Sequence, residues 1–567
     1  MSDKIVDEEK FPFSTIRPKQ QRIIDKINDN PDKRYIILEA ETGVGKSAIA
    51  VTACKNGRQG YVVTSTKQLQ NQYISDFYDQ PIASVKGKVN YRCYFEDRLT
   101  CANGYCLVNS KQAKECKMEG LCPYFNARNR AFKSDIFLTS YKYFLKAADN
   151  PNTFKPRGTI VFDECHLLEN VLVESAEIEL SLEHLDNQYG ILDSAELKEA
   201  TRLANTSVLK NGYSQENEEW IRTIYELIFD KKVRKLEEIK DSLGMVKDAS
   251  ELTEEEMDSI IEENDEYYEM DKFCRKIDAF FKSTNIKEDW IIEAKEDGLL
   301  LTPLNVQSIF KEYIERMASE RIIFMSATIL DIDGFIKMLG INKEDCLVIR
   351  CESDFNPEKS PIYCLQSCST NYQALKDEKN LEKIANEVSK ILDRHKNEKG
   401  IIHTGNSTIS KYLKDHIKND RLLVRYENIQ NNDIVNHHHT SKKPTVLVSS
   451  SLNEGVDLKD DLSRFQIIVK VPFLSLSDSR TKAKRDLDTK WYLAETFKKF
   501  VQQCGRSTRN SKDFSITYVL DNKFLYWFGV AKKNKWFSKN FISRIKKGDF
   551  EKWFTKKLWK LMNVFKN

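Results

Sequence analysis

The sequence contains no long apolar stretch. It has no run of about 18 or more apolar residues, and a helix that crosses a membrane needs about 20. The first residues, MSDKIVDEEKFPF, also lack the apolar centre of a secretory signal peptide. We therefore expect no transmembrane helix and no export signal. With 567 residues, 40% of them hydrophobic, the chain is long enough for three or four packed domains.

Charge of one sign is not in excess either. The chain has 89 lysines and arginines against 86 acids, which gives a formal net charge of +3. A chain that is basic throughout would indicate contact with nucleic acid over much of its surface, and this composition excludes that arrangement. Any site for a polyanion must then be a local track of basic side chains.

Cysteines are scarce and unevenly placed. Five of the 13 lie between Cys93 and Cys122. Without an export signal, such a cluster predicts metal ligation in a reducing compartment and not a disulfide framework. Tetrahedral zinc and an iron–sulfur cluster both take four thiolates, so five candidates leave one spare. Spacing alone favours zinc.

Short β-branched runs alternate with helical stretches in both halves of the chain. This alternation predicts two tandem α/β domains with parallel sheets, whose ligands gather at the carboxyl ends of the strands. The predicted strands are 34–39, 61–66, 158–164 and 321–328 in the first half and 400–405, 445–450, 465–473 and 514–520 in the second.

Two segments interrupt the first domain. Residues 86–130 are cysteine-rich and irregular, and residues 170–300 have the pattern of charged helices. The acidic run 251–271 is typical of a solvated helix face. Three consecutive histidines, 437–439, favour a loop over a metal site, because adjacent side chains do not converge easily on one ion.

A phosphate-binding loop follows the first predicted strand. The segment AETGVGKS, 40–47, matches the pattern GxxxxGK[ST] except for alanine at its first position. Backbone N–H groups of such a loop cradle phosphate at a helix N-terminus, and glycines permit its backbone angles. Lys46 would reach the β- and γ-phosphates, and Ser47 would bind Mg²⁺. The residues that we assign to nucleotide binding in this loop are Glu41, Thr42, Gly43, Val44, Gly45, Lys46 and Ser47.

Two acids at the end of a later strand complete a hydrolysis site. Asp163 can hold Mg²⁺, and Glu164 can orient and deprotonate the attacking water. The small hydroxyl residues of Ser326-Ala-Thr328 follow another strand and suit a hinge that senses the nucleotide.

The second domain supplies a glutamine and two arginines. Gln502, Arg506 and Arg509 lie in the segment QQCGRSTR, and the two arginines, three residues apart, share a helix face. Arginine stabilises charge on a phosphoryl group during transfer. Together with the loop at 40–47, these residues predict an ATP site between the two domains.

In this order, the motifs resemble those of superfamily 2 helicases, and specifically the group that contains the XPD and DinG helicases. Ser140 replaces an asparagine that is usual there, and DECH stands where DEAH is typical. The segments that carry the resemblance are RPKQ (17–20), EAETGVGKS (39–47), TSTKQL (64–69), DIFLTSY (135–141), DECH (163–166), SAT (326–328), HTG (403–405), EGVD (454–457) and QQCGRSTR (502–509).

The resemblance implies ATP, Mg²⁺ and a [4Fe–4S] cluster as cofactors. Arg17 and Gln20 would contact the nucleotide, with Gln20 at the adenine, and Gly455 and Asp457 would complete the nucleotide site from the second domain.

The borders of the cysteine-rich segment are similar to those of the iron–sulfur insertion in that group. GKVNYRC precedes its first cysteine and CPY ends it. This similarity turns the expectation from zinc to iron–sulfur. Cys93 and Cys122 are the firmest ligands, Cys116 follows, and either Cys101 or Cys106 would be the fourth.

The resemblance also implies an α/β fold with two tandem RecA-like parallel-sheet motor domains, and with an iron–sulfur insertion and a helical arch insertion in the first. The expected bounds are 1–85, 131–170 and 301–345 for the first motor domain, 86–130 for the iron–sulfur domain, 171–300 for the arch and 346–567 for the second motor domain.

Such a protein would be an ATP-dependent DNA helicase that moves 5′ to 3′ on single-stranded DNA and unwinds duplex in replication, repair or recombination. We expect single-stranded and forked DNA as partners, no membrane, a monomer, and a place in the cytoplasm or nucleoid, or in the nucleus of a eukaryote. Aromatic candidates for base stacking are Tyr73, Tyr91, Tyr124, Phe125 and Tyr141. Basic candidates for the DNA track are Lys67, Lys86, Lys88, Arg92, Arg128 and Arg130.

Other functions remain open at this point. One is an RNA-directed or nucleoprotein-remodelling ATPase with a structural zinc site, and an iron assay with a comparison of DNA and RNA unwinding separates the two. Another is a nucleic-acid sensor with a vestigial ATPase, which the intact Lys46 and Glu164 argue against. The basic and aromatic stretch 531–567 fits either a nucleic-acid surface or a packed helical end, and its apolar spacing favours the latter.

Overall fold

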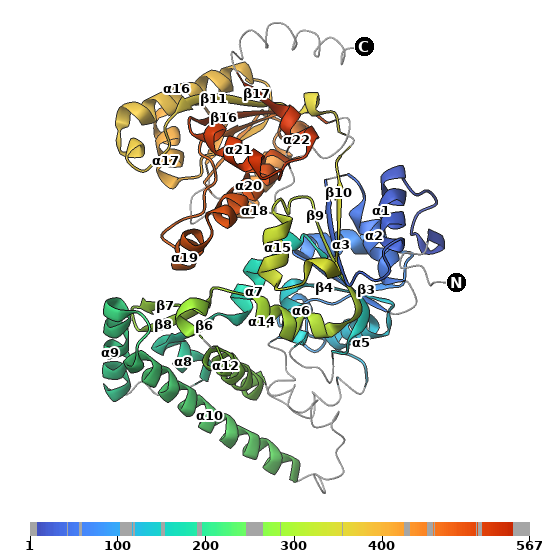
Figure 1. Cartoon of the computed structure of the whole chain (residues 1–567), viewed down its shortest axis with the longest axis vertical. Helices are drawn as coiled ribbons and strands as arrows, with labels where there is room; N and C mark the ends of the chain where they lie inside the picture. Colours follow the sequence, from blue (N-terminus) through green and yellow to red (C-terminus); the bar gives the residue numbers. More distant parts are fainter. Residues whose placement is uncertain are drawn as a thin grey trace.

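The computed structural model of the protein contains two α/β domains and a separate, mainly helical insertion (Figure 1). It describes residues 8–41, 43–55, 59–102, 116, 119–148, 154–189, 195–244, 265–283, 285–353, 355–424, 431–450, 458, 460–505, 507 and 513–547. Within these ranges, every helix is too short or too polar to cross a membrane.

The first domain is built on a sheet of seven parallel strands in the order β10-β1-β9-β5-β2-β4-β3. Their bounds are β1 (Tyr35–Ala40), β2 (Gly60–Thr64), β3 (Ile82–Ser84), β4 (Ile136–Ser140), β5 (Arg157–Asp163), β9 (Ala318–Ser326) and β10 (Cys346–Cys351). Because β10 pairs with β1, the first sheet extends to Cys351, beyond residue 345 where we expected the domain to end.

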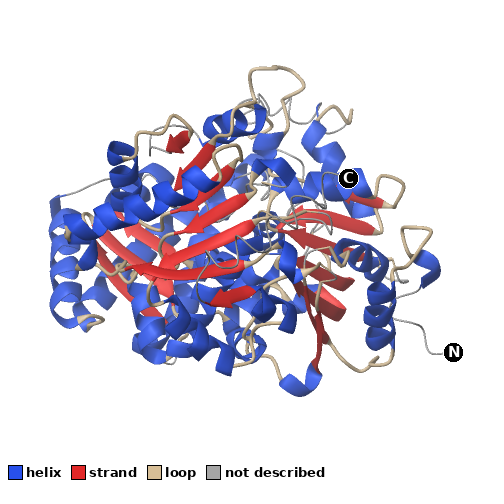
Figure 2. Cartoon of the chain, turned by 90° about the horizontal axis from the view of Figure 1, so that it is seen from above, coloured by secondary structure: helices blue, strands red, loops and turns tan. Residues whose placement is uncertain are grey.

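Helices pack on both faces of this sheet (Figure 2). They are α1 (Pro18–Asn28), α2 (Lys46–Cys54), α3 (Lys67–Asp76), α5 (Pro123–Lys133), α6 (Tyr141–Ala148), α7 (Leu168–Ala176), α14 (Gln307–Tyr313) and α15 (Ile332–Leu339). Successive side chains of a strand point to opposite faces, so β1 serves two cores. Tyr35 and Ile37 belong to one core, whereas Ile36 and Leu38 belong to the other.

The second domain repeats the plan with seven parallel strands in the order β13-β14-β12-β15-β16-β11-β17. The strands are β11 (Ile362–Cys368), β12 (Gly400–His403), β13 (Leu422–Val424), β14 (Val446–Ser449), β15 (Phe465–Ile468), β16 (Ile516–Asp521) and β17 (Ile545–Lys547). The helices are α16 (Glu378–Arg394), α17 (Ser407–His416), α18 (Asn431–Thr440), α19 (Ser479–Leu487), α20 (Thr489–Gly505), α21 (Phe524–Lys533) and α22 (Lys539–Arg544). The predicted class, two tandem parallel-sheet domains, is confirmed.

The insertion between α7 and α14 has a core of its own. Trp220, Phe280 and Leu301 are buried in it, away from both parallel sheets. Its helices are α8 (Leu182–Tyr189), α9 (Ala195–Asn211), α10 (Gln215–Gly244), α12 (Asp265–Phe281) and α13 (Ile286–Asp289).

A small antiparallel sheet forms the base of this insertion. It joins β6 (Ile178–Ser181), β8 (Gly298–Pro303) and β7 (Trp290–Lys295), in that order. The sequence predicted a mostly helical segment, and the sheet was missed. Of the acidic run 251–271, residues 251–264 lie outside the described residues, and the remainder begins α12, where Met270 is buried.

The histidines 437–439 lie on helix α18, so the predicted loop was wrong. His437 and His439 are exposed, whereas His438 is buried. The His438 ring contacts the Leu462 carbonyl oxygen through Nε2 at 2.8 Å and the Thr445 hydroxyl through Nδ1 at 2.9 Å. The middle histidine therefore ties α18 to the sheet as a buried structural residue.

Burial lowers the pKa of His438 to about 4, although its contact with the Leu462 carbonyl opposes the shift. The unfolded chain, with a histidine pKa of about 6.5, takes up a proton first as the pH falls. Stability present above pH 6.5 is therefore lost as the pH falls towards 4, by about 2 kcal/mol at pH 5. We predict that amide exchange in β14 and β15 accelerates from pH 7.5 to 5, after correction for intrinsic rates, and that His438→Gln weakens this acceleration. The exposed His439→Gln is the matched control, and an equal response in all three proteins would contradict the prediction.

Candidate nucleotide-hydrolysis site

The loop between β1 and α2 has the backbone of a phosphate-binding loop. Gly43 and Gly45 adopt the left-handed region, with φ of 89° and 88°, which glycine enters without steric cost. Lys46 Nζ donates a hydrogen bond to the Ala40 carbonyl oxygen at 2.9 Å, so its ammonium group lies inside the loop. Val44 is buried in the core and anchors the loop, and Thr42 lies outside the described residues.

Arg17 and Gln20 support this loop from helix α1. Arg17 Nη1 donates to the Gly43 carbonyl oxygen at 3.0 Å, and Gln20 Nε2 donates to the Gly45 carbonyl oxygen at 3.2 Å. A Cβ atom on Gly45 would lie 2.3 Å from Gln20 Nε2, so a larger residue would displace this amide from the loop. Both residues therefore meet the nucleotide loop, while the contact of Gln20 with adenine stays a prediction.

The two acids at the end of β5, Asp163 and the following Glu164, differ in pKa. Burial and the charge of Glu164 raise the pKa of Asp163 to about 6, and Lys46 opposes this rise. Burial would also raise the pKa of Glu164, but the hydrogen bond from His166 outweighs burial and lowers the pKa to about 2. Glu164 is thus ionised at neutral pH and can accept a proton. Its backbone is in the left-handed region, with φ of 60°, a strain that clusters at functional sites.

The residues present fit a magnesium ion. The Tyr73 hydroxyl donates to Asp163 Oδ2 at 2.8 Å and also shares a hydrogen bond with Ser47, so both predicted ligands meet at this tyrosine. A carboxylate and a hydroxyl oxygen are ligands that Mg²⁺ prefers. Tyr73 is fully buried, as is Tyr141, so neither is available to stack on bases as we had expected. Tyr124 is also buried, whereas Tyr91 and Phe125 are partly buried.

Three motifs, DECH, SAT and QQCGRSTR, meet between the two parallel sheets. His166 Nδ1 lies 2.8 Å from Ser326 Oγ and 3.2 Å from Glu164 Oε2. On its other side, Gln502 Nε2 from α20 lies 2.6 Å from His166 Nε2 and 3.2 Å from Thr328 Oγ1. When the Gln502 amide donates to Nε2, the ring proton is on Nδ1 and faces Glu164. The structure thus brings Gln502 to the hydrolysis site, whereas Arg506, Arg509, Gly455 and Asp457 lie outside the described residues.

A cavity of about 460 Å³ lies between the two domains and is lined by both. The first domain contributes Glu41, Glu164 and Thr328, and the second contributes Gln502 and Phe541. A cavity of this size at the carboxyl ends of two parallel sheets suits a nucleotide.

The sequence did not reveal how the chain end contributes to this cavity. Trp536, Phe537 and Phe541 are buried beside it, which confirms a packed helical end for the described part of 531–567. Ser538 Oγ donates to Glu41 Oε1 of the loop at 2.6 Å. The alternation of aromatic and polar residues was the available signal, but its direction was ambiguous.

Four of the five predicted cluster ligands are described, and all four are buried: Cys93, Cys101, Cys116 and Cys122. Cys122 Sγ and Cys101 Sγ are 3.8 Å apart. Burial, and then the neighbouring thiols of Cys122 and Cys93, raise the pKa of Cys101 to about 12. Among the described residues, no group of three or more Cys, His, Asp or Glu side chains is arranged to hold a metal ion, and Cys106 lies outside them.

Comparisons with known proteins agree with this geometry. Residues 66–185 match the DEAD_2 family model, and residues 382–541 match the model of a helicase C-terminal domain. The chain is a superfamily 2 helicase of the XPD/DinG type. The matched segments contain DECH in the first motor domain and QQCG in the second, which are the two sides of the cavity.

Relatives and solved structures span nearly the whole helicase. The ATP-dependent DNA helicase YoaA of Escherichia coli is 22% identical, over 90% of this chain and 92% of the relative. A protein of Methanocaldococcus jannaschii named as a probable ATP-dependent helicase is also 22% identical, over 94% and 95% of the two chains. A solved XPD helicase has a TM-score of 0.60 at 18% identity, over 94% of this chain and all of that one. Xpd4 of S. tokodaii has a TM-score of 0.52 at 13% identity, over 94% and 99%.

A prediction follows from the roles of Asp163 and Glu164, the acid pair. Glu164→Gln should bind ATP with an affinity within about twofold of the wild type but hydrolyse it about 10²–10⁴-fold more slowly, because the amide cannot take the proton from water. Binding of a fluorescent ATP analogue and phosphate release measure the two quantities. Unchanged turnover would place the proton acceptor elsewhere.

Proposed function

We propose that this helicase hydrolyses ATP to move along single-stranded DNA in the 5′ to 3′ direction and thereby unwinds forked duplex in replication, repair or recombination. The observation that carries the proposal is the polar bridge from Glu164 through His166 to Gln502, because it joins the hydrolysis site to the opposite motor domain. A change in the position of Glu164 or His166 therefore affects Gln502 and, with it, helix α20 of the second domain. Two motors coupled in this way can alternate between a closed and an open state.

Each residue at the site has a separate task in this cycle. Lys46 contacts the phosphates, Asp163 and Ser47 hold the metal, and Glu164 takes the proton from water. Held there, a magnesium ion would help to neutralise the charge that develops on the phosphate during transfer. Gln502 holds α20 against the hydrolysis site, and we expect Arg506 and Arg509, which follow in the chain, to act on the phosphate. After hydrolysis the cleft opens and the two motor domains separate. Their contacts with the DNA backbone then move forward along the strand.

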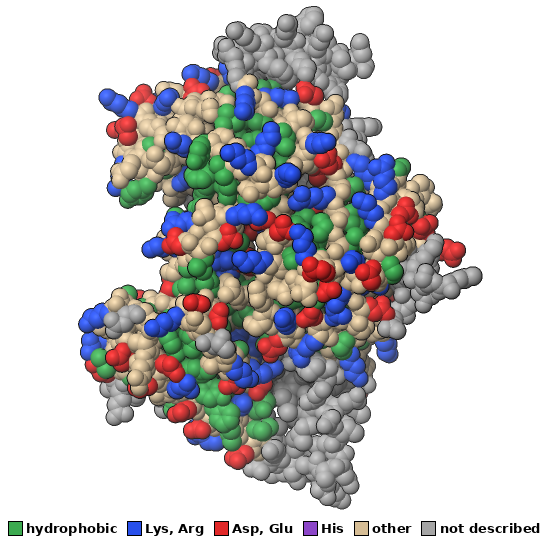
Figure 3. Space-filling model, in the orientation of Figure 1, with side chains coloured by type: hydrophobic (Ala, Val, Ile, Leu, Met, Phe, Trp, Pro, Cys, Tyr) green, Lys and Arg blue, Asp and Glu red, His purple; other side chains and the backbone are tan. Residues whose placement is uncertain are grey.

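The DNA grip is expected to be local, because basic and acidic side chains are interspersed over the visible face of the molecule (Figure 3). Lys67, Arg92 and Arg130 are exposed near the cysteine-bearing segment. Tyr94 and Phe95 are 59% and 37% exposed beside Cys93, and they replace Tyr73 and Tyr141 as candidates for stacking. Stacking on such rings contributes about 1–3 kcal/mol per base and does not depend on sequence.

A forked substrate tests the proposal. Lys46→Ala should lose ATP hydrolysis by at least about 100-fold, since its ammonium no longer reaches the phosphates, yet bind single-stranded DNA within about twofold. Wild-type protein should unwind a fork with a 5′ tail and not one with a 3′ tail. The exposed Lys26→Ala, on α1, controls for loss of a charge. Unwinding of RNA forks with equal efficiency would favour the RNA-directed alternative, and turnover by Lys46→Ala would remove the loop assignment.

The buried cysteines support a second part of the proposal, a [4Fe–4S] cluster. Cys93, Cys101, Cys116 and Cys122 are all buried in one segment, and Cys122 Sγ lies 3.8 Å from Cys101 Sγ. Four thiolates are the usual ligand set of the cluster, which would cross-link this segment and contribute to its folding. We assign Cys106 as the spare thiol.

Anaerobically purified protein should therefore be brown and hold about four irons per chain. Cys122→Ser should lose the colour and should lose DNA unwinding more severely than basal ATP hydrolysis, because the nucleotide loop lies outside the segment. Cys106→Ser is the matched control and should stay coloured and active. Iron quantification beside the visible spectrum measures this, and stoichiometric zinc without iron would refute the cluster.

A further inference from the structure

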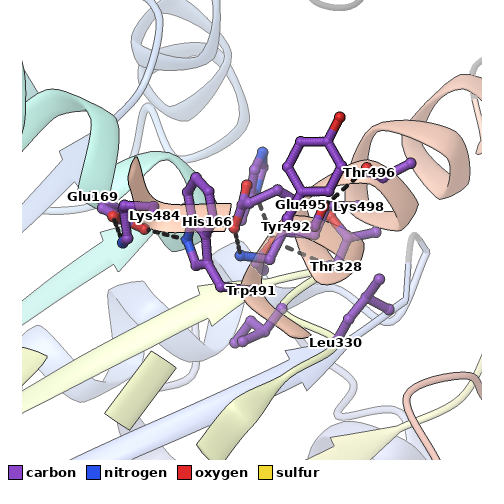
Figure 4. A network of polar contacts seen from close by, with 12 residues as sticks. His166, Glu169, Thr328, Leu330, Lys484, Trp491, Tyr492, Glu495, Thr496 and Lys498 are labelled. Atoms are coloured by element: carbon purple, nitrogen blue, oxygen red, sulfur yellow. Dashed lines mark hydrogen bonds and ion pairs between the residues drawn. The ribbon is translucent and has the colours of Figure 1, made fainter. Parts of the chain in front are cut away.

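Glu169 is a buried carboxylate whose hydrogen-bond donors come from the other motor domain. It lies on α7, three residues after His166, and its side chain is 9% exposed. Arg480 Nη2 donates to Glu169 Oε1 at 2.6 Å, and Lys484 Nζ donates to the same oxygen. Trp491 Nε1 donates to Oε2 at 3.1 Å. All three donors lie on α19 or α20 of the second domain, and Figure 4 shows Lys484 and Trp491 converging on Glu169.

Helix α20 presents one polar stripe to the first motor domain. Trp491, Glu495, Lys498 and Gln502 are spaced by four, three and four residues, a spacing that places them on one helix face. Trp491 contacts Glu169 at one end of the stripe, and Gln502 contacts His166 at the other. Between them, Lys498 pairs with Glu495 within the stripe (Figure 4). His166 and Glu169, three residues apart, thus contact α20 near its two ends. The segment QQCGRSTR begins in the last turn of this helix.

The same cluster reaches the base of the helical insertion. Arg480 also donates through Nε to the Pro303 carbonyl oxygen at 2.9 Å and through Nη2 to the Leu304 carbonyl oxygen at 3.3 Å. Its neighbour Ser479 donates a hydrogen bond to Glu293 on β7. Arg480 therefore touches the first motor domain and the end of the insertion sheet at once.

The negative charge of Glu169 holds the two cationic side chains of α19 at this contact between the domains. Burial would raise its pKa, but Lys484 and Arg480 outweigh burial and hold it at about 2. Lys484 is itself largely buried, and desolvation lowers its pKa. Two buried cations share this carboxylate, so its neutralisation leaves them without their counter-charge.

We propose that Glu169 is a positioning residue for ATP hydrolysis: it seats α20 on the first motor domain, and so places Gln502 against His166, beside Asp163 and Glu164. The inference rests on the proposed hydrolysis site in the cleft. Since Glu169 lies outside the lining of the cavity, its effect should fall on the chemical step and not on nucleotide binding.

Glu169→Gln, which keeps the shape and removes the charge, tests the proposal in the full-length helicase. We expect kcat of DNA-stimulated ATP hydrolysis to fall by at least about tenfold, with KM and the affinity for a fluorescent ADP analogue within about twofold of the wild type. Glu169→Asp, which keeps the charge, should retain several times more kcat than the glutamine variant. The matched control is Glu174→Gln on the same helix, where Glu174 is 59% exposed and pairs at the surface with Lys142 of α6 at 3.1 Å.

A second measurement separates positioning from a merely structural role. Spin labels, one in each motor domain, should give a single short distance in the wild type with a non-hydrolysable ATP analogue and a broader, longer distribution in Glu169→Gln. Wild-type kcat in this variant, a rise of KM with unchanged kcat, or loss of folded far-ultraviolet dichroism would each overturn the proposal. Failure of the hydrolysis site itself would be distinguished by Lys46→Ala and Glu164→Gln, which would then also keep full turnover.

Discussion

The contact between α20 and the segment after β5 constrains how the two motor sheets face each other. Both sheets end their strands at the cleft, and the groups there are carboxylates, a histidine and amides that need partners when they are buried. Gln502 supplies one partner to His166, and Trp491 supplies another to Glu169. If one residue were inserted in α20 between Trp491 and Gln502, these two side chains would be turned by about 100° relative to each other, and they could not both keep their partners. The register of the two motors is therefore fixed by side-chain chemistry and not by apolar area alone.

Much of this arrangement could be predicted because it is encoded locally. A β-branched strand, a glycine loop and a small-residue helix stand next to each other between Tyr35 and Cys54, so the pattern identifies the phosphate loop without any long-range information. The same holds for DECH after β5 and for SAT after β9. Each motif lies at the carboxyl end of a parallel strand, and because those ends share one edge of the sheet, the three motifs are expected to lie together.

The features that were missed depend on contacts between distant parts of the chain. β6 and β8 pair although more than one hundred residues separate Ser181 from Gly298, and neither strand alternates strongly enough to be recognised alone. Helix α18 places His438 in contact with Thr445 and Leu462, where it is buried. Three consecutive histidines do not indicate which of them is buried. Tyr73 resembled an exposed aromatic in a polar helix, yet its hydroxyl reaches Asp163 in a neighbouring strand.

The position of the described chain end follows from the same need for enclosure. The cleft must limit bulk water around an ionised glutamate and a lysine while it admits a nucleotide and the attacking water, and charges act more strongly in such a low-dielectric space. Trp536, Phe537 and Phe541 provide an apolar wall on the side of the second domain, and Ser538 in the same segment reaches Glu41 in the phosphate loop. This wall belongs to the second motor domain but touches the loop of the first, so it closes only when the domains meet. Glu169 joins α20 to the first domain at a second place, outside the cavity, and both contacts therefore respond to one movement of the second domain.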